Sequence, residues 1–205
     1  MLSTSSNEIV IIDLPARAVV ATVPVGTKPL QIVFNSTGSV AFVTNQLSGN
    51  VSVIDTVSRS VVRTFTTAAG PNGIKVTPDG RFVYVTNQYA NALTIHDAAT
   101  GSVVRTISGL AGANWVAITR DGTRALVTCP NTTTVAVIDT ATMSIVTTLP
   151  TGSLPQSVAI SSDGTRAYVI NQYSMTATAI DVAKASIVKT ITRAGIYPMV
   201  VAMKQ

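Results

Sequence analysis

Few residues of this sequence could do acid–base chemistry, and most of them follow a fixed spacing. The chain of 205 residues has nine acidic residues. Five recur at one constant interval, each after an apolar run: Asp13, Asp55, Asp97, Asp139 and Asp181. Three more stand in turn-like segments at the same spacing, at Asp79, Asp121 and Asp163, so only Glu8 lies outside the pattern. No spare pair of carboxylates remains, and the sequence therefore offers no general acid and base.

The remaining reactive side chains are one histidine and one cysteine. His96 stands where other repeats have isoleucine, and a lone histidine cannot build a zinc or copper site, so we expect a packing or surface role. Cys129 would need an activating base to act as a nucleophile, and His96 is the only candidate. No glycine-rich phosphate loop precedes a helix. We therefore predict no catalytic residue, no metal and no cofactor.

The constant interval between these aspartates extends through the whole chain and indicates the fold. Other columns keep the same register, including Asn45, Asn87, Cys129 and Asn171, and the glycines Gly38, Gly80, Gly122 and Gly164. Self-similarity at about 40–45 residues is typical of the four-stranded blade of a propeller. We predict an all-β fold, a β-propeller with five repeats of about 42 residues each.

Each repeat reads as four short strands rich in Val, Ile, Thr, Phe and Tyr. The runs are almost continuously apolar, which indicates sheets that pack on both faces, as stacked blades do. We predict one propeller domain over 1–205, with a partial blade at 1–24, four blades at 29–66, 71–108, 113–150 and 155–192, and a terminal strand at 197–204. Either five blades close, with one blade built from both termini, or the chain is a segment of a longer propeller, for example one of seven blades. Open blade edges would invite pairing with a second copy.

The five regularly spaced aspartates fall where the third strand of each repeat meets a turn. A carboxylate there can accept hydrogen bonds from the backbone N–H groups of the turn that follows. We therefore expect these aspartates to be structural.

Amides and aromatic residues gather in the loops expected on one face, around the mouth of the central channel. Such a rim suits peptides, sugars or other uncharged polar ligands, through stacking and hydrogen bonds. The alternative is that each asparagine caps its own loop while glutamine and tyrosine are merely exposed. The candidate ligand-binding residues are Asn45, Gln46, Asn87, Gln88, Tyr89, Asn114, Trp115, Asn171, Gln172, Tyr173 and Tyr197.

Basic residues gather in the turns expected on the opposite face. The chain has a net charge of +5 and a pI near 9.7, so this face could contact a nucleic acid or another anionic polymer. The alternative is a solvated face, partly neutralised by the turn aspartates. The basic-face residues are Arg17, Arg59, Arg81, Arg120, Arg124, Arg166 and Lys184.

The second-strand sequences carry a family resemblance. The segment Val83–Asn87 contains the tetrapeptide Tyr-Val-Thr-Asn, and Ala41–Asn45 and Ala167–Asn171 are close variants. With Asp-Gly upstream and Val-Ile-Asp-Thr downstream, the repeat resembles the YVTN family of β-propellers, whereas the third unit departs from it at Leu126–Cys129. The resemblance implies a propeller, usually of seven blades, in the periplasm or on the cell surface. Related propellers include lactonases and dehydrogenase subunits, but no catalytic motif carries over residue by residue.

These observations favour a propeller without enzymatic activity, a binding or scaffold module that recognises a protein, a peptide or a polar ligand at its channel face. One alternative is a fragment of a propeller enzyme, a lactonase-like hydrolase or an oxidoreductase subunit. Another is a nucleic-acid binder that acts through charge. No apolar run approaches the ~18 residues of a membrane-spanning helix.

Overall fold

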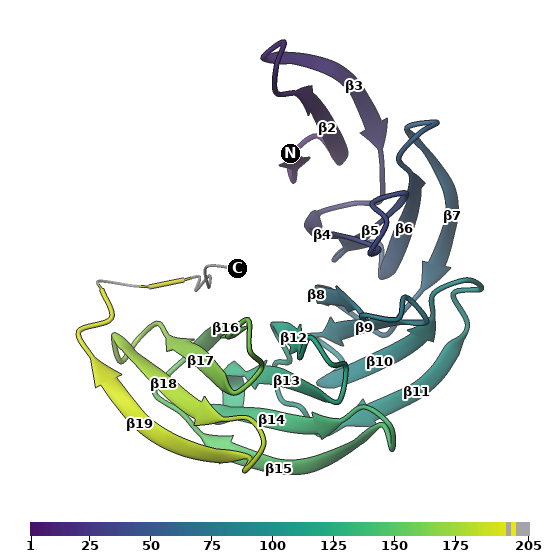
Figure 1. The fold of residues 1–205 in the computed structure, drawn as a ribbon. Helices are drawn as coiled ribbons and strands as arrows, with labels where there is room; N and C mark the ends of the chain where they lie inside the picture. The colour runs from purple at the N-terminus through teal and green to yellow at the C-terminus, as the bar shows by residue number, and fades with distance from the viewer. Residues whose placement is uncertain (196–197, 200–205) are drawn as a thin grey trace.

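The computed structural model describes residues 1–195 and 198–199, and these form five antiparallel sheets (Figure 1). The first sheet has three strands and each of the others has four, in chain order from one edge to the other. The strands are β1 (Leu2–Ser3), β2 (Glu8–Asp13) and β3 (Ala18–Pro24); β4 (Pro29–Phe34), β5 (Val40–Asn45), β6 (Asn50–Asp55) and β7 (Ser60–Thr66); β8 (Pro71–Val76), β9 (Phe82–Asn87), β10 (Ala92–Asp97) and β11 (Val103–Ser108); β12 (Val116–Ile118), β13 (Arg124–Cys129), β14 (Thr134–Asp139) and β15 (Ser144–Pro150); and β16 (Pro155–Ile160), β17 (Arg166–Asn171), β18 (Thr176–Asp181) and β19 (Ser186–Thr192).

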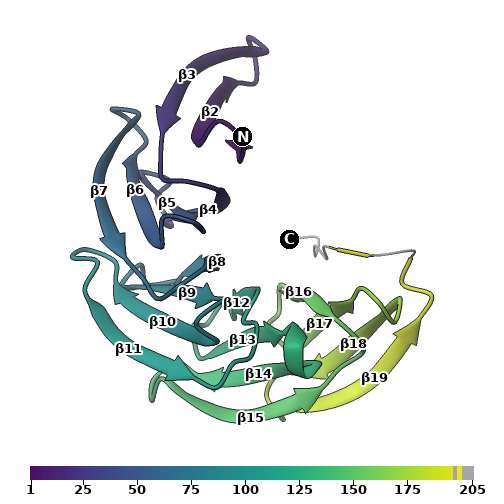
Figure 2. The ribbon, with the colours of Figure 1, turned by 180° about the vertical axis from the view of Figure 1, so that it is seen from behind.

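The sheets fan around a common centre, so the predicted all-β propeller architecture is confirmed (Figures 1 and 2). The strands β4, β8, β12 and β16 lie innermost, and β3, β7, β11, β15 and β19 lie along the outside. The described sheets cover an arc, and no strand pairing joins the β1–β3 sheet to the β16–β19 sheet across its opening. The predicted terminal strand at 197–204 lies outside the described residues, apart from 198–199, which are not in a strand.

Two local features depart from a uniform repeat. The inner strand β12 begins at Val116 rather than at Ala113, and Ala113 donates its N–H to the carbonyl of Leu110 in a turn. A short 3-10 turn, Pro130–Thr132, replaces the loop found after the second strand of the other sheets. Its proline stands where Gln46, Gln88 and Gln172 stand in the other repeats.

The core lies between the sheets rather than inside any one of them. One buried cluster joins Tyr84, Leu93 and Ile95 of the β8–β11 sheet to Val127 and Ile138 of the β12–β15 sheet. Three similar clusters join the other neighbouring pairs of sheets. Each of the three middle sheets therefore packs against a neighbour on both faces. This is the physical reason why its strands are almost continuously apolar.

The regularly spaced aspartates bind the turn that follows each third strand, as predicted. Oδ1 of Asp97 accepts the N–H of Thr100 at 2.8 Å, and that of Asp181 accepts the N–H of Lys184 at 3.0 Å. Asp13, Asp55 and Asp139 make the same bond to Ala16, Ser58 and Thr142. The backbone bond from Thr100, followed by its hydroxyl, holds the pKa of Asp97 below its usual value, and the same kind of bond lowers the pKa of Asp55 and Asp139.

These lowered pKa values predict that the protein loses stability in acid. A carboxyl whose pKa is lower in the folded state stabilises the fold above its unfolded pKa and loses that contribution as pH falls through the folded pKa. We expect the urea midpoint to decline between about pH 5 and pH 2. Asp97→Asn should have a lower urea midpoint than the wild type at pH 7, and this difference should shrink at pH 2. A deficit of equal size at both pH values would contradict the assignment.

Candidate functional site

The structure removes the asparagine column from the predicted rim. Asn45, Asn87 and Asn171 are each 0% exposed, so a ligand at the face cannot reach them. Each donates its Nδ2 to a hydroxyl of the neighbouring strand of its own sheet, for example from Asn87 to Thr94 Oγ1 at 2.9 Å. These side chains fasten the second strand to the third, and their assignment as ligand-binding residues is corrected to a structural role.

Most of the other rim amides link neighbouring sheets to one another. Asn114 accepts from Asn72 Nδ2 at 2.6 Å and donates to Gln156 Oε1 at 2.8 Å. Gln156 in turn donates to Gln172 at 3.2 Å. Gln46, which is buried, donates to Gln88 at 3.2 Å. Asn72, Asn114 and Gln156 therefore link three neighbouring sheets, and Gln46 and Gln88 separately link two. Oε1 of the buried Gln46 has no hydrogen-bond partner among the described residues.

The aromatic members of the rim are placed differently. Tyr89 and Tyr173 are 58% and 64% exposed in equivalent loops, and Leu47, at the same repeat position, is 64% exposed. Trp115 is half-buried and packs beside the cluster that joins the β12–β15 and β16–β19 sheets. Tyr197 lies outside the described residues. The predicted rim is thus reduced to two exposed tyrosines and one tryptophan.

The inner strands line an open cavity at the centre, and most of its lining residues were not among the predicted site residues. It measures about 700 Å³ and is lined by β8, β12, β16 and the turns that follow them, with Gln31 and Phe34 of β4. Among the described residues, its charged lining residues are Lys75 and Arg120, its aromatic ones are Phe34 and Trp115, and no carboxylate side chain lines it. Lys75 and Arg120 are both exposed, and neither forms an ion pair among the described residues.

Lys75 is the functional candidate that sequence reasoning missed. Its repeat position holds Val33, Ala117 and Ala159 in the other sheets, so the lysine breaks an apolar column on the inner strand. This lysine in an apolar column could have identified the site from the sequence. Whether its side chain faces the centre depends on the orientation of β8, which is set by the packing of the neighbouring sheets.

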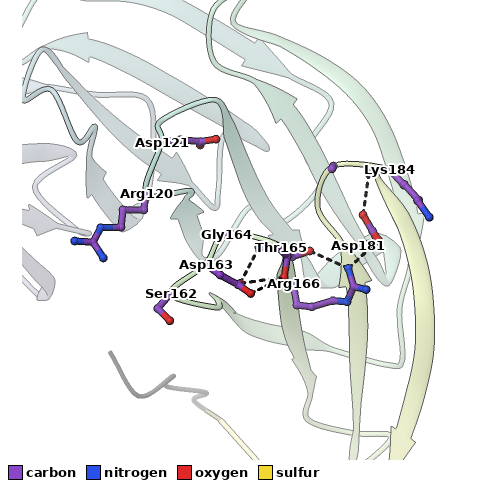
Figure 3. Close-up of a pocket in the computed structure, with 10 residues that line it drawn as sticks. Arg120, Asp121, Ser162, Asp163, Gly164, Thr165, Arg166, Asp181 and Lys184 are labelled. Atoms are coloured by element: carbon purple, nitrogen blue, oxygen red, sulfur yellow. Dashed lines mark hydrogen bonds and ion pairs between the residues drawn. The ribbon is translucent and has the colours of Figure 1, made fainter.

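Two of the seven cations of the predicted basic face form ion pairs with carboxylates among the described residues. Arg124 pairs with Asp139, and Arg166 pairs with Asp181 at 2.7 Å. A cleft of about 750 Å³ on this face contains Arg120, Arg166 and Lys184 together with Asp121, Asp163 and Asp181 (Figure 3). Figure 3 shows Arg120 extending away from the Arg166–Asp181 pair.

The other members of the basic face lie outside this cleft. Arg17 and Arg59 occupy equivalent turns with positive φ, and Arg81 lies over the Phe82 ring, 5.2 Å from its centroid. Interleaved charges of both signs favour the solvated alternative for this face.

His96 and Cys129 are both held in the interior. His96 is 0% exposed, with Nδ1 3.0 Å from the Gly101 carbonyl and Nε2 2.9 Å from Thr94 Oγ1, and burial lowers its pKa. Burial raises the pKa of the Cys129 thiol to about 11, so the thiol is neutral near pH 7 and a poor nucleophile. His96 is therefore the packing residue that we expected. Among the described residues, no group of three or more His, Cys, Asp or Glu side chains is placed to hold a metal ion.

The five sheets fanned around a common centre define a β-propeller. The chain belongs to the lactonase family of seven-bladed β-propellers, whose model matches residues 11–197. No helix in the described part of the chain is long and apolar enough to cross a membrane.

Two solved structures illustrate the relationship. A chain of hydrazine synthase from Kuenenia stuttgartiensis is 28% identical, with a TM-score of 0.75 over 80% of this chain and 48% of that one. A functionally unknown protein from Desulfotomaculum acetoxidans is 15% identical, with a TM-score of 0.85 over 96% of this chain and 66% of that one, and shows the fold alone. The chain thus spans about half and about two thirds of those chains. No curated protein matches it.

Proposed function

We propose that this chain is a binding segment of a propeller without catalytic activity of its own, and that its ligand enters the central cavity. The observation that carries the proposal is the cavity lining, which combines Lys75 and Arg120 with Trp115 and has no carboxylate side chain in the part of the chain that the structure describes. The burial of His96 and Cys129 and the bonding of the turn aspartates also support it. We further propose a YVTN-type protein of the periplasm or cell surface, which rests on the family resemblance.

The lining favours an organic anion that carries an apolar or aromatic group. Two cations without a counter-charge raise the local concentration of anions, most strongly in a concave site with low-dielectric walls. Trp115 and Phe34 offer flat apolar surfaces for the rest of such a ligand. This ligand differs from the uncharged one expected at the rim, because several of the rim amides bond to one another within the chain.

Quenching of tryptophan fluorescence tests this cavity directly, because Trp115 is the only tryptophan. We expect the ratio of iodide to caesium quenching to be higher for Trp115 than for free N-acetyltryptophanamide. Lys75→Gln or Arg120→Gln should lower the iodide quenching constant by about twofold to fivefold, as loss of a nearby charge in water predicts. Benzoate should bind more tightly than benzamide, its neutral isostere.

The matched control is Lys184→Gln, which removes a cation that does not line this cavity. It should leave iodide quenching unchanged, whereas added sodium chloride should weaken the iodide preference in the wild-type protein. A ratio of iodide to caesium quenching in the wild type no higher than that of free N-acetyltryptophanamide would refute the proposal. So would a change in Lys184→Gln as large as that in Lys75→Gln.

The second candidate function is a lactonase-like hydrolase, and the family match is the observation that favours it. Acid–base groups for such a reaction would have to come from outside the residues described above. Lactone hydrolysis by the product of the whole gene, but not by residues 1–205 alone, would favour this function over the binding proposal. Turnover by residues 1–205 alone would overturn the proposal that this segment is non-catalytic.

A further inference from the structure

A second cleft, which shares Thr77 and Pro78 with the central cavity, lies between the β8–β11 and β12–β15 sheets. It measures about 420 Å³ and is lined by residues of the turns on the basic face, among them Asp79, Asp121, Thr140 and Ala141. Tyr84 of β9 also lines it. The cleft therefore runs from the turns inward to a buried side chain of the inter-sheet core.

Tyr84 has a hydroxyl group without a partner. The residue is 0% exposed, and its OH makes no hydrogen bond to any described residue. The ring packs in the cluster with Leu93 and Ile95, which fixes its direction. Buried hydroxyl groups in folded proteins almost always have a hydrogen-bond partner, so this one indicates that a polar group completes the cleft.

The surroundings of this hydroxyl favour a positive group. Two carboxylates, Asp79 and Asp121, line the cleft against one cation, Arg81, whose guanidinium lies over Phe82. Burial, and next the charges of Asp139 and Asp79, raise the pKa of Tyr84 to about 12, so the phenol is neutral and sits in a negative field. No described residue donates a hydrogen bond to the backbone carbonyls of Thr140 or Ala141.

The preceding pair of sheets shows which group fits such a cleft. There Phe42 stands at the position of Tyr84, and the cleft of about 440 Å³ contains Arg63. The Arg63 guanidinium donates to the carbonyl of Ala98 at 2.9 Å and to that of Ala99. These two carbonyls are the repeat equivalents of those of Thr140 and Ala141.

The corresponding arginine does not fill the second cleft. Arg105 occupies the repeat position of Arg63, but it is exposed on β11 and does not line the cleft. Met143 stands where the preceding sheet has Gly101, and it both lines the cleft and packs against the apolar cluster. The carbonyls that bind a guanidinium in one cleft are therefore left without one in the next.

We propose that this cleft binds a guanidinium group from outside the chain, with the Thr140 and Ala141 carbonyls and the Tyr84 hydroxyl as acceptors. Either a small molecule or an arginine side chain of a partner protein could supply that group. The neighbouring carboxylates of Asp79 and Asp121 add long-range attraction for the cation.

Calorimetric titration with propylguanidinium and with propylurea, its neutral analogue, tests the proposal. We expect propylguanidinium to bind and propylurea to bind at least tenfold more weakly, as hydrogen bonds to a charged group predict. Tyr84→Phe should weaken propylguanidinium binding by about tenfold. This variant should fold, because the repeat itself carries Phe42 at that position. Tyr168→Phe, in the same column of the β16–β19 sheet, is the matched control and should leave binding unchanged.

A calorimetric titration with a third ligand, an arginine-containing peptide, distinguishes the two sources of the guanidinium. A blocked Gly-Arg-Gly peptide that binds more tightly than propylguanidinium supports a partner protein, whereas weaker peptide binding supports a small molecule. Equal binding of propylguanidinium and propylurea would overturn the proposal. Binding that is absent in the wild type but appears in Arg105→Gln would also overturn it, because the chain's own arginine would then fill the cleft.

Discussion

Gly73→Ala is expected to destabilise the protein by roughly 3 kcal/mol, which is the upper part of the usual range for overpacking. A Cβ at this position of β8 would lie 2.5 Å from the carbonyl oxygen of Asn114 and 3.0 Å from Cα of Trp115. Both are backbone atoms of the next sheet and cannot turn aside. The same carbonyl accepts the N–H of Gly73 at 3.0 Å and the hydroxyl of Thr86 at 2.7 Å. Moving the strand to make room would therefore break two links between the sheets.

Urea unfolding at pH 7 measures this effect, and Gly80→Ala provides the control. Gly80 has a positive φ of 74°, but its added Cβ would have no neighbour within 4 Å. The control should cost only the backbone strain of an alanine in that conformation, about 1 kcal/mol. A loss in Gly73→Ala no larger than that in Gly80→Ala would contradict the close approach of β8 to the β12–β15 sheet.

Ile95→Ala should have a comparable effect, with a loss of about 2–5 kcal/mol. Ile95 is 0% exposed and belongs to the cluster that joins the β8–β11 sheet to the β12–β15 sheet. Its truncation leaves a cavity that close-packed strands on both sides cannot fill. The same interface sets the relative positions of Lys75 on β8 and Trp115 before β12, so the variant should also reduce the iodide quenching of Trp115.

Val103→Ala is the matched control for Ile95→Ala. Val103 lies on the neighbouring strand β11 of the same sheet and is 56% exposed. Its truncation should change the free energy of unfolding by no more than about 0.5 kcal/mol. Equal losses in the two variants would mean that the core does not lie between the sheets.

The candidate site was much less predictable than the fold, and the rim asparagines show why. Their repeat spacing correctly places them at the ends of the second strands, but spacing does not distinguish an amide that faces solvent from one that bonds its neighbouring strand. Asn87 has a partner in Thr94 of the same sheet, whereas Asn114 has partners in two other sheets. The roles of Lys75 and Tyr84 likewise depend on groups from a neighbouring sheet.

The amino-acid sequence by itself determined the repeating blade of this protein, since strand propensity, turn residues and the aspartate column all act within a single repeat. Asp97 finds Thr100 only three residues away, so its role could be predicted locally. The stacking of the sheets alone decided which residues meet at the centre and in the clefts. Arg63 binds the carbonyls of Ala98 and Ala99 in the next sheet, whereas Arg105 in the same repeat position binds no such pair. Such contacts join residues about one repeat apart, and their geometry depends on the side chains of both sheets at once.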